Sequence, residues 1–217
     1  MVAHQGSGAQ TKGKKYERKI AKQLTKMFPG IEFNRTAYSG STSNFSAQSG
    51  VEGFTGDLFP SPNSILSGVF SFELKNHDKF KLAQIFNNGS VYRDFLQQNV
   101  TDARRQGYAT PVLIMHSASE REDILTIPFQ DSMYESLVEK GFPVMITQAQ
   151  YTDKRTTKVN KFNMIVTTLK GFGSMSAQKL HSWYSKLDWD INNKHQEGID
   201  FPIDIDNLVN NLEGDKS

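Results

Sequence analysis

Three segments with distinct hydrophobic patterns follow one another between Val69 and Met115 and limit the fold more than any other feature. Residues 69–76 alternate as a strand does, with apolar side chains on one face (Phe70, Phe72, Leu74) and polar side chains on the other (Ser71, Glu73, Lys75). Residues 91–106 carry an apolar stripe at helical spacing that Gly107 closes, and Pro111 to Met115 form a core strand. This order predicts an α/β fold with a mixed central sheet.

The flanking sequence supplies further elements of both types. A helix is predicted over 13–28, where Pro29-Gly30 stops the pattern, and short strands are predicted over 31–35 and from Asp57. We expect the first helix on one side of the sheet and the helix over 91–106 on the other. Weaker patterns predict a helix near 130–140, strands near 143–150 and 160–169, and a helix over 175–187.

A polar segment separates the first two predicted strands. From residue 36 to residue 56, 12 of 21 residues are Ser, Thr or Gly, which predicts a long loop. Loops longer than about 12 to 15 residues inside a compact domain are usually functional or disordered.

Composition excludes several kinds of site. The chain has no cysteine, so disulfides, thiolate metal sites and cysteine nucleophiles are excluded and any metal must bind oxygen or imidazole. The five histidines lack the spacing of a zinc site. No apolar run approaches the roughly 20 residues that cross a bilayer, and the first residues do not resemble a signal peptide. We therefore expect a cytoplasmic protein that contacts no membrane.

Charge is distributed unevenly along the chain. Residues 1–35 carry 8 basic and 2 acidic side chains, a balance of +6, whereas residues 188–217 carry 2 basic and 8 acidic side chains, a balance of −6. A basic first segment suits a polyanion, because neutralising phosphates releases counterions. On charge alone, an ordinary solvated surface explains the same pattern equally well.

Two acidic motifs lie on consecutive predicted strands. Asp57 follows Gly56 at the start of one strand, and Glu73 and Lys75 share a face of the next. If the two strands pair as a hairpin, Asp57 comes beside Glu73, and two adjacent carboxylates repel unless a cation neutralises them. Mg2+ prefers such oxygen ligands, and Lys75 would supply a donor at an attacked phosphate. Taken singly, each motif is far more often plain surface charge.

The order of these motifs resembles that of the PD-(D/E)xK nuclease superfamily, specifically the archaeal, phage and Gram-positive Holliday junction resolvases. Those proteins begin with a helix containing Gly, then Glu-Arg, then an apolar stripe, which Gly13, Glu17-Arg18, Ile20 and Leu24 match. An Arg and a Ser-Gly loop follow, matched by Arg35 and Ser39-Gly40, and then come the Asp57 and Glu73-Leu74-Lys75 strands. The resemblance covers about a third of the chain. It departs at Gly56, where the family usually has Pro.

The resemblance implies a restriction-endonuclease-like core, a metal site and a DNA substrate. Glu17, Asp57, Glu73 and the Leu74 carbonyl would surround Mg2+, with Mn2+ able to substitute, and Lys75 would act at the scissile phosphate. The DNA contacts would be Arg35, Ser39 and Gly40, together with the basic side chains Lys14, Lys15 and Arg18. Glu17 lies beside the apolar stripe, although an exposed acid in ordinary helical ion pairs is the competing interpretation. Gln97 and Gln98 lie where the superfamily often directs a Gln towards the site, and a plain helix surface explains them equally well.

These features predict a metal-dependent DNA endonuclease that acts as a homodimer on branched DNA such as Holliday junctions. Two alternatives remain: a nuclease with another target (restriction-type, end-processing or mobile-element) and a non-catalytic DNA-binding protein of the same fold. The predicted organisation is a flexible segment over 1–12, a nuclease domain over 13–187 and an acidic tail over 188–217 with an amphipathic helical stripe over 205–213. That stripe is the candidate dimer surface.

Overall fold

The protein is described by a computed structural model over residues 7–36, 55–117, 121–153 and 155–194, with side chains from Thr11 onwards. Its helices are α1 (Ser7–Met27), α2 (Ala83–Phe86), α3 (Ser90–Arg105), α4 (Asp131–Glu139), α5 (Leu169–Gly173), α6 (Ala177–Tyr184) and α7 (Ile191–Lys194). Its strands are β1 (Phe33–Arg35), β2 (Leu58–Pro60), β3 (Phe70–Asn76), β4 (Thr110–His116), β5 (Ile124–Pro128), β6 (Val144–Thr152) and β7 (Val159–Thr168). Among the described residues, no helix is long and apolar enough to span a membrane.

Within these ranges the strands form one mixed sheet of seven, in the order β1-β2-β3-β4-β5-β7-β6. Strands β3 and β4 are parallel, joined through α3, and each other neighbouring pair is antiparallel. The predicted mixed α/β sheet is confirmed. The sequence analysis missed β5, a five-residue strand at the centre of the sheet.

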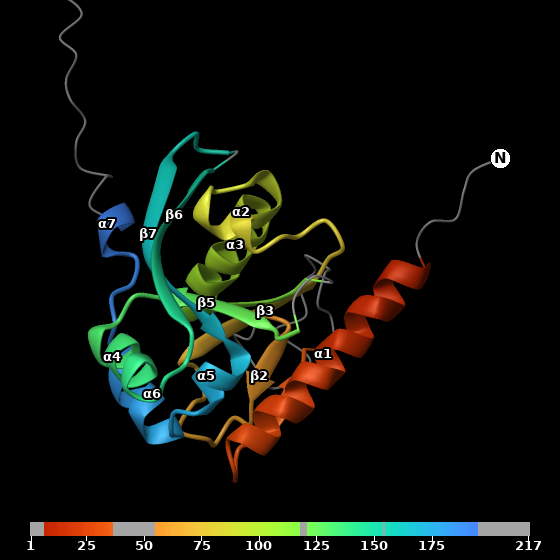
Figure 1. Cartoon of the computed structure of the whole chain (residues 1–217), viewed down its shortest axis with the longest axis vertical. Helices are drawn as coiled ribbons and strands as arrows, with labels where there is room; N and C mark the ends of the chain where they lie inside the picture. The colour runs from red at the N-terminus through yellow and green to blue at the C-terminus, as the bar shows by residue number, and fades with distance from the viewer. Residues whose placement is uncertain (1–6, 37–54, 118–120, 154, 195–217) are drawn as a thin grey trace, which may run out of the picture.

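Helices cover both faces of the sheet (Figure 1). On one face, α1 packs through Tyr16, Ile20, Leu24 and Phe28 against the apolar side of β3, and α4, α5 and α6 extend the same core. On the other face, α2 and α3 pack on the opposite side of β4, β6 and β7. The predicted placement of α1 and α3 on opposite sides is therefore correct. Helix α1 begins at Ser7, six residues before the predicted start, so residues 7–12 belong to the helix.

The polar side of β3 is enclosed by helix α3. Ser71 and Glu73 are buried, at 0% and 2% exposed, because α3 lies over them. Helix α3 keeps close to the strand through Asn99, whose Nδ2 donates to the Ser71 carbonyl at 3.1 Å, and through Gln106, whose Nε2 donates to the Phe70 carbonyl at 3.2 Å. This face is thus polar but enclosed, which is the setting in which carboxyl groups change their acidity.

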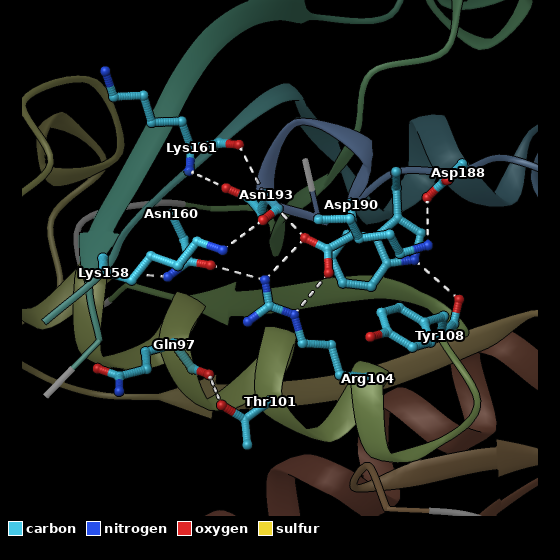
Figure 2. Close-up of polar contacts among 12 residues, drawn as sticks. Gln97, Thr101, Arg104, Tyr108, Lys158, Asn160, Lys161, Asp188, Asp190 and Asn193 are labelled. Carbon is cyan, nitrogen blue, oxygen red and sulfur yellow. Dashed lines mark hydrogen bonds and ion pairs between the residues drawn. The ribbon is translucent and has the colours of Figure 1, made fainter. Parts of the chain in front are cut away.

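The first residues of the predicted acidic tail are attached to the sheet (Figure 2). Arg104 of α3 donates from Nε to Asp190 Oδ2 at 2.8 Å and from Nη2 to Asp190 Oδ1 at 2.9 Å. Asn193 donates to the same carboxylate at 2.9 Å and exchanges hydrogen bonds with the backbone of Lys161 on β7. Residues 188–194 therefore belong to the folded unit, beyond the boundary predicted at 187. The stripe over 205–213 lies outside the described residues.

Candidate active site

Pairing of β2 with β3 brings the two acidic motifs together. Leu58 lies opposite Phe72, and the N–H of Asp57 donates to the Phe72 carbonyl at 2.7 Å. The carboxylate of Asp57 then accepts from the backbone N–H of Leu74, with 2.8 Å between the nitrogen and Oδ2. Asp57 is thereby held against the residue between Glu73 and Lys75. The predicted hairpin is present.

Gly56 explains why the strands approach so closely at this point. A Cβ atom at residue 56 would lie 2.5 Å from the carbonyl oxygen of Phe72 and 2.9 Å from its nitrogen, which are distances that real Cβ atoms do not adopt. The carbonyl of Gly56 accepts a 2.5 Å hydrogen bond from the Thr36 hydroxyl. The Pro usual before the Asp in the resembling nucleases would carry that Cβ, so this chain uses Gly for a steric reason.

The two carboxyl groups are buried beside each other. Burial, and then the charge of Asp57, raise the pKa of Glu73 to about 8, against the lowering effect of Lys75. Burial also raises the pKa of Asp57 to about 6, although the hydrogen bond from Leu74 opposes the shift. Both groups can be ionised together only at a cost, which a nearby cation would offset. The donor set therefore fits a divalent metal ion.

Lys75 is fixed at the edge of this pair. Its ammonium group forms an ion pair with Glu73 Oε1 and donates to Gln98 Oε1 at 2.8 Å. It also lies 5.5 Å from the centre of the Phe95 ring, a cation–π distance. The Lys75 side chain is 20% exposed, so it is oriented by α3 and still reachable from solvent. Of the two glutamines considered in the sequence, Gln98 is the one that meets the site.

Asp102 is a neighbouring acid that the sequence analysis did not single out. It lies one helical turn after Gln98 on α3, and its charge raises the pKa of both Asp57 and Glu73. Burial raises its own pKa, while Arg105 and Lys75 lower it. The signal available in the sequence was the four-residue spacing from Gln98, which places both side chains on one helix face.

Glu17 approaches the site from α1. It is 9% exposed, so it is not a solvated helix acid, and its charge contributes to the raised pKa of Asp57. Arg35 of β1 donates to Glu17 Oε2, from Nε at 2.6 Å and as an ion pair from Nη2 at 2.5 Å. Arg35 thus holds Glu17 at the Asp57 side of the sheet and remains 23% exposed.

Comparison of the sequence with known protein families agrees with this arrangement. Residues 8–182, well over half of the chain, match the family described as "phage putative PDDEXK endonuclease". The chain belongs to this family. No curated protein matches the sequence significantly. The superfamily expected from the motif order is confirmed.

Membership of the PDDEXK family agrees with a hairpin that carries Asp57, Glu73 and Lys75. Nucleases of this type typically use divalent metal ions. In the part of the chain that the structure describes, no three acidic, histidine or cysteine side chains converge closely enough to hold a metal by themselves. A cation bound here would therefore need other oxygen atoms, such as the Leu74 carbonyl, water or phosphate.

The expected DNA contacts are distributed in two ways. Lys14, Lys15 and Arg18 are exposed on α1, as a surface that binds phosphate requires. Ser39 and Gly40 lie outside the described residues, as does nearly all of the predicted loop over 36–56.

Proposed function

We propose that the protein is a metal-dependent DNA endonuclease that cleaves phosphodiester bonds at branched DNA. The observation that carries the proposal is the buried Asp57–Glu73 pair with Lys75 beside it, in a chain of the PDDEXK endonuclease family. Structural carboxylates are rarely buried next to each other, since each raises the cost of ionising the other. A bound cation would offset that cost, and a phosphate would complete its coordination.

In this proposal Asp57, Glu73 and the Leu74 carbonyl would hold Mg2+, Glu17 would contribute from α1 together with water or phosphate oxygens, and Mn2+ is expected to substitute. When bound, the cation would supply Lewis-acid stabilisation of negative charge on the phosphate and of a hydroxide-like nucleophile. Asp57 contributes an oxygen whose position is fixed by the Leu74 N–H. Glu73 contributes a buried oxygen with little access to water, which strengthens its interaction with a cation.

Lys75 acts at the scissile phosphate. Gln98 and Phe95 restrict its ammonium group to a position beside Glu73. The ammonium group would therefore already be oriented when a phosphate binds. It would donate to a non-bridging oxygen and counter the negative charge that develops during water attack. By analogy with the resembling resolvases, attack in line with the 3′ oxygen would leave a 5′ phosphate.

Substrate binding is assigned to the basic face of α1. Lys14, Lys15 and Arg18 are exposed there, on the helix that carries Glu17 to the site. A branched substrate and a homodimer rest on the resemblance to Holliday junction resolvases. A four-way junction presents two symmetry-related strands, and a two-fold dimer places one site on each.

The test is cleavage of a labelled four-way junction, the matching linear duplex and a single strand, each with and without Mg2+. We expect cleavage of the junction alone, dependent on the metal. Equal cleavage of the linear duplex would replace the junction by another DNA target. Binding without cleavage in Mg2+ or Mn2+ would favour the non-catalytic alternative. Sedimentation showing a monomer with and without junction DNA would refute the dimer.

A further inference from the structure

A second polar cluster lies on the α1 face of the sheet, apart from the Asp57–Glu73 pair. At its centre is Asp123, 7% exposed, just before β5. Its Oδ1 accepts from the Tyr16 hydroxyl at 3.1 Å and lies 3.0 Å from His116 Nδ1, and its Oδ2 accepts from Lys19 Nζ at 2.9 Å. We call Tyr16, Lys19, His116 and Asp123 the Asp123 cluster. It joins α1 to the ends of β4 and β5.

This cluster fixes the orientation of the His116 ring. A carboxylate only accepts hydrogen bonds, so the ring nitrogen that faces Asp123, Nδ1, carries a proton. The Tyr16 ring lies 5.9 Å from the imidazole, centre to centre, and limits its movement on a second side. The His116 side chain is nevertheless 31% exposed. Among the described residues, Nε2 has no hydrogen-bond partner. Asp123 therefore orients the ring through Nδ1, and Nε2 is available to a ligand.

The location of His116 relates it to the proposed active site. Strands β3 and β4 are parallel, with Lys75 beside Met115 and Asn76 beside His116. His116 therefore lies at the same end of the parallel strands as Lys75, one strand away, but on the α1 face of the sheet, whereas Lys75 lies on the α3 face. Tyr16 of the cluster precedes Glu17 on α1, so consecutive residues of this helix contact the Asp123 cluster and the proposed active site.

The charge around His116 suits an anion. Lys19 is 49% exposed and directly adjacent through Asp123, and Lys12, 44% exposed, lies one helical turn before Tyr16. Lys12 pairs with Asp78, two residues after the end of β3. The cluster contains one carboxylate, which is buried and faces Lys19, His116 and Tyr16. Around it, Lys19 and Lys12 are exposed cations, and the exposed acid Asp78 is paired with Lys12.

We propose that His116, held by Asp123 and flanked by Lys19, is a DNA phosphate contact next to the scissile position. The inference rests on the proposed DNA substrate and deepens it. With one proton on Nδ1 towards Asp123, a contact from Nε2 to a phosphate oxygen requires a second ring proton, so His116 would meet the phosphate as an imidazolium. A DNA strand that crosses the ends of β3 and β4, from Lys75 on one face towards the exposed basic side of α1 on the other, would pass His116.

A purely structural role, in which His116 only anchors α1, makes a different prediction. Asparagine can place its amide donor where Nδ1 lies, so His116→Asn can keep Asp123 paired while removing Nε2. A structural role survives that exchange, and a phosphate contact does not. His181 on α6 is the matched control, because it is partly exposed but lies in a helix outside the Asp123 cluster.

The experiment measures junction affinity by fluorescence anisotropy in EDTA, where binding is separated from cleavage, across a series of salt concentrations. For His116→Asn we expect about tenfold weaker binding and a salt dependence reduced by about one phosphate contact, with His181→Asn unchanged. Unchanged affinity and salt slope in folded His116→Asn would overturn the assignment.

A measurement on the unmodified protein guards against a variant that does not fold. With 15N-labelled histidine, we expect the His116 Nε2 resonance to shift on adding junction DNA while the His181 resonances stay in place. A His116 resonance that ignores bound DNA would refute the contact and leave the nuclease proposal standing. A protein that binds no DNA at all would refute both.

Discussion

The backbone N–H of Leu74 donates to Oδ2 of Asp57 at 2.8 Å. The backbone between Glu73 and Lys75 therefore holds the Asp57 carboxylate in place. The Glu73-Leu74-Lys75 strand thus fixes the carboxylate of Asp57, which directly precedes the neighbouring strand. Because Gly56 lets the strands approach closely at this point, a side chain there would move Asp57 away from both partners. The geometry of the pair depends on backbone contact more than on side-chain packing.

Removing the charge of Asp57 should abolish cleavage without abolishing binding. Asp57→Asn keeps an oxygen that can accept from Leu74 but loses the negative charge that a metal ion requires, so we expect cleavage to fall by orders of magnitude. Junction affinity in EDTA should stay within a few-fold of the original. Glu135→Gln, an exposed acid on α4, is the control. Full cleavage by Asp57→Asn would end the assignment of the site.

Glu73 should destabilise the metal-free protein as pH rises. Its folded pKa of about 8 exceeds the ordinary value of 4.5, so the folded state retains a proton that the unfolded state releases. Stability is therefore lost between about pH 4.5 and pH 8, by an amount on the order of a few kcal/mol. Glu73→Gln removes this titration and should melt higher than the original at pH 9, with a smaller gain at pH 5.

Thermal unfolding in EDTA at both pH values checks this expectation. Adding Mg2+ at pH 9 should then raise the melting temperature of the original protein and not that of Glu73→Gln, because ligand binding stabilises only the state that binds it. A gain from Glu73→Gln that is identical at pH 5 and pH 9 would show that the carboxyl titrates normally.

Arg35 and Glu17 should behave as one coupled unit. Arg35→Ala leaves Glu17 buried and unpaired near Asp57, and breaking a buried pair in this way costs about 3 to 5 kcal/mol, less here because Arg35 is partly exposed. Glu17→Gln in the same protein should restore much of the loss. Urea unfolding of both single variants and the double variant gives the coupling energy, and additive effects would argue against a strong pair.

Arg104 should contribute to stability through Asp190. Arg104→Met leaves the Asp190 carboxylate, 2% exposed, with Asn193 as its remaining side-chain donor among the described residues, and should destabilise by about 3 kcal/mol or more. The double variant with Asp190→Asn should be more stable than Arg104→Met alone. Arg93→Met, an exposed arginine on the same helix, is the control. A loss equal to that of Arg93→Met would mean that the Arg104–Asp190 pair adds nothing.

The sequence predicted the helices and strands around the site well, but not which polar side chains are buried between them. Alternation in β3, the apolar stripe of α3 and the order of acidic motifs were enough to place Asp57 beside Glu73, because the hairpin is local. The helix over 91–106 was expected on the side of the sheet opposite the first helix, but alternation in β3 cannot show that this helix lies close enough to bury Ser71 and Glu73. For the same reason Gln98 remained ambiguous and Asp102 was not considered.

Two further differences have physical causes outside any single segment. The strand β5 was missed because its five residues carry no alternation, being buried on both faces. The attachment of residues 188–194 was missed because their acidity suggested solvent, whereas Asp190 is neutralised by an arginine far away in sequence. A charge pattern reports the sign of a segment and not the location of its partner.

The pairing of Arg104 with Asp190 also orders events in time. The two residues are 86 positions apart, and a ribosome adding roughly 5 to 20 residues each second needs about 4 to 17 seconds to make that interval. During that period α3, which carries Gln98 and Asp102, lacks the carboxylate that anchors its last turn. The helix that positions Lys75 is therefore anchored only after β7, the last strand of the described sheet, has been synthesised.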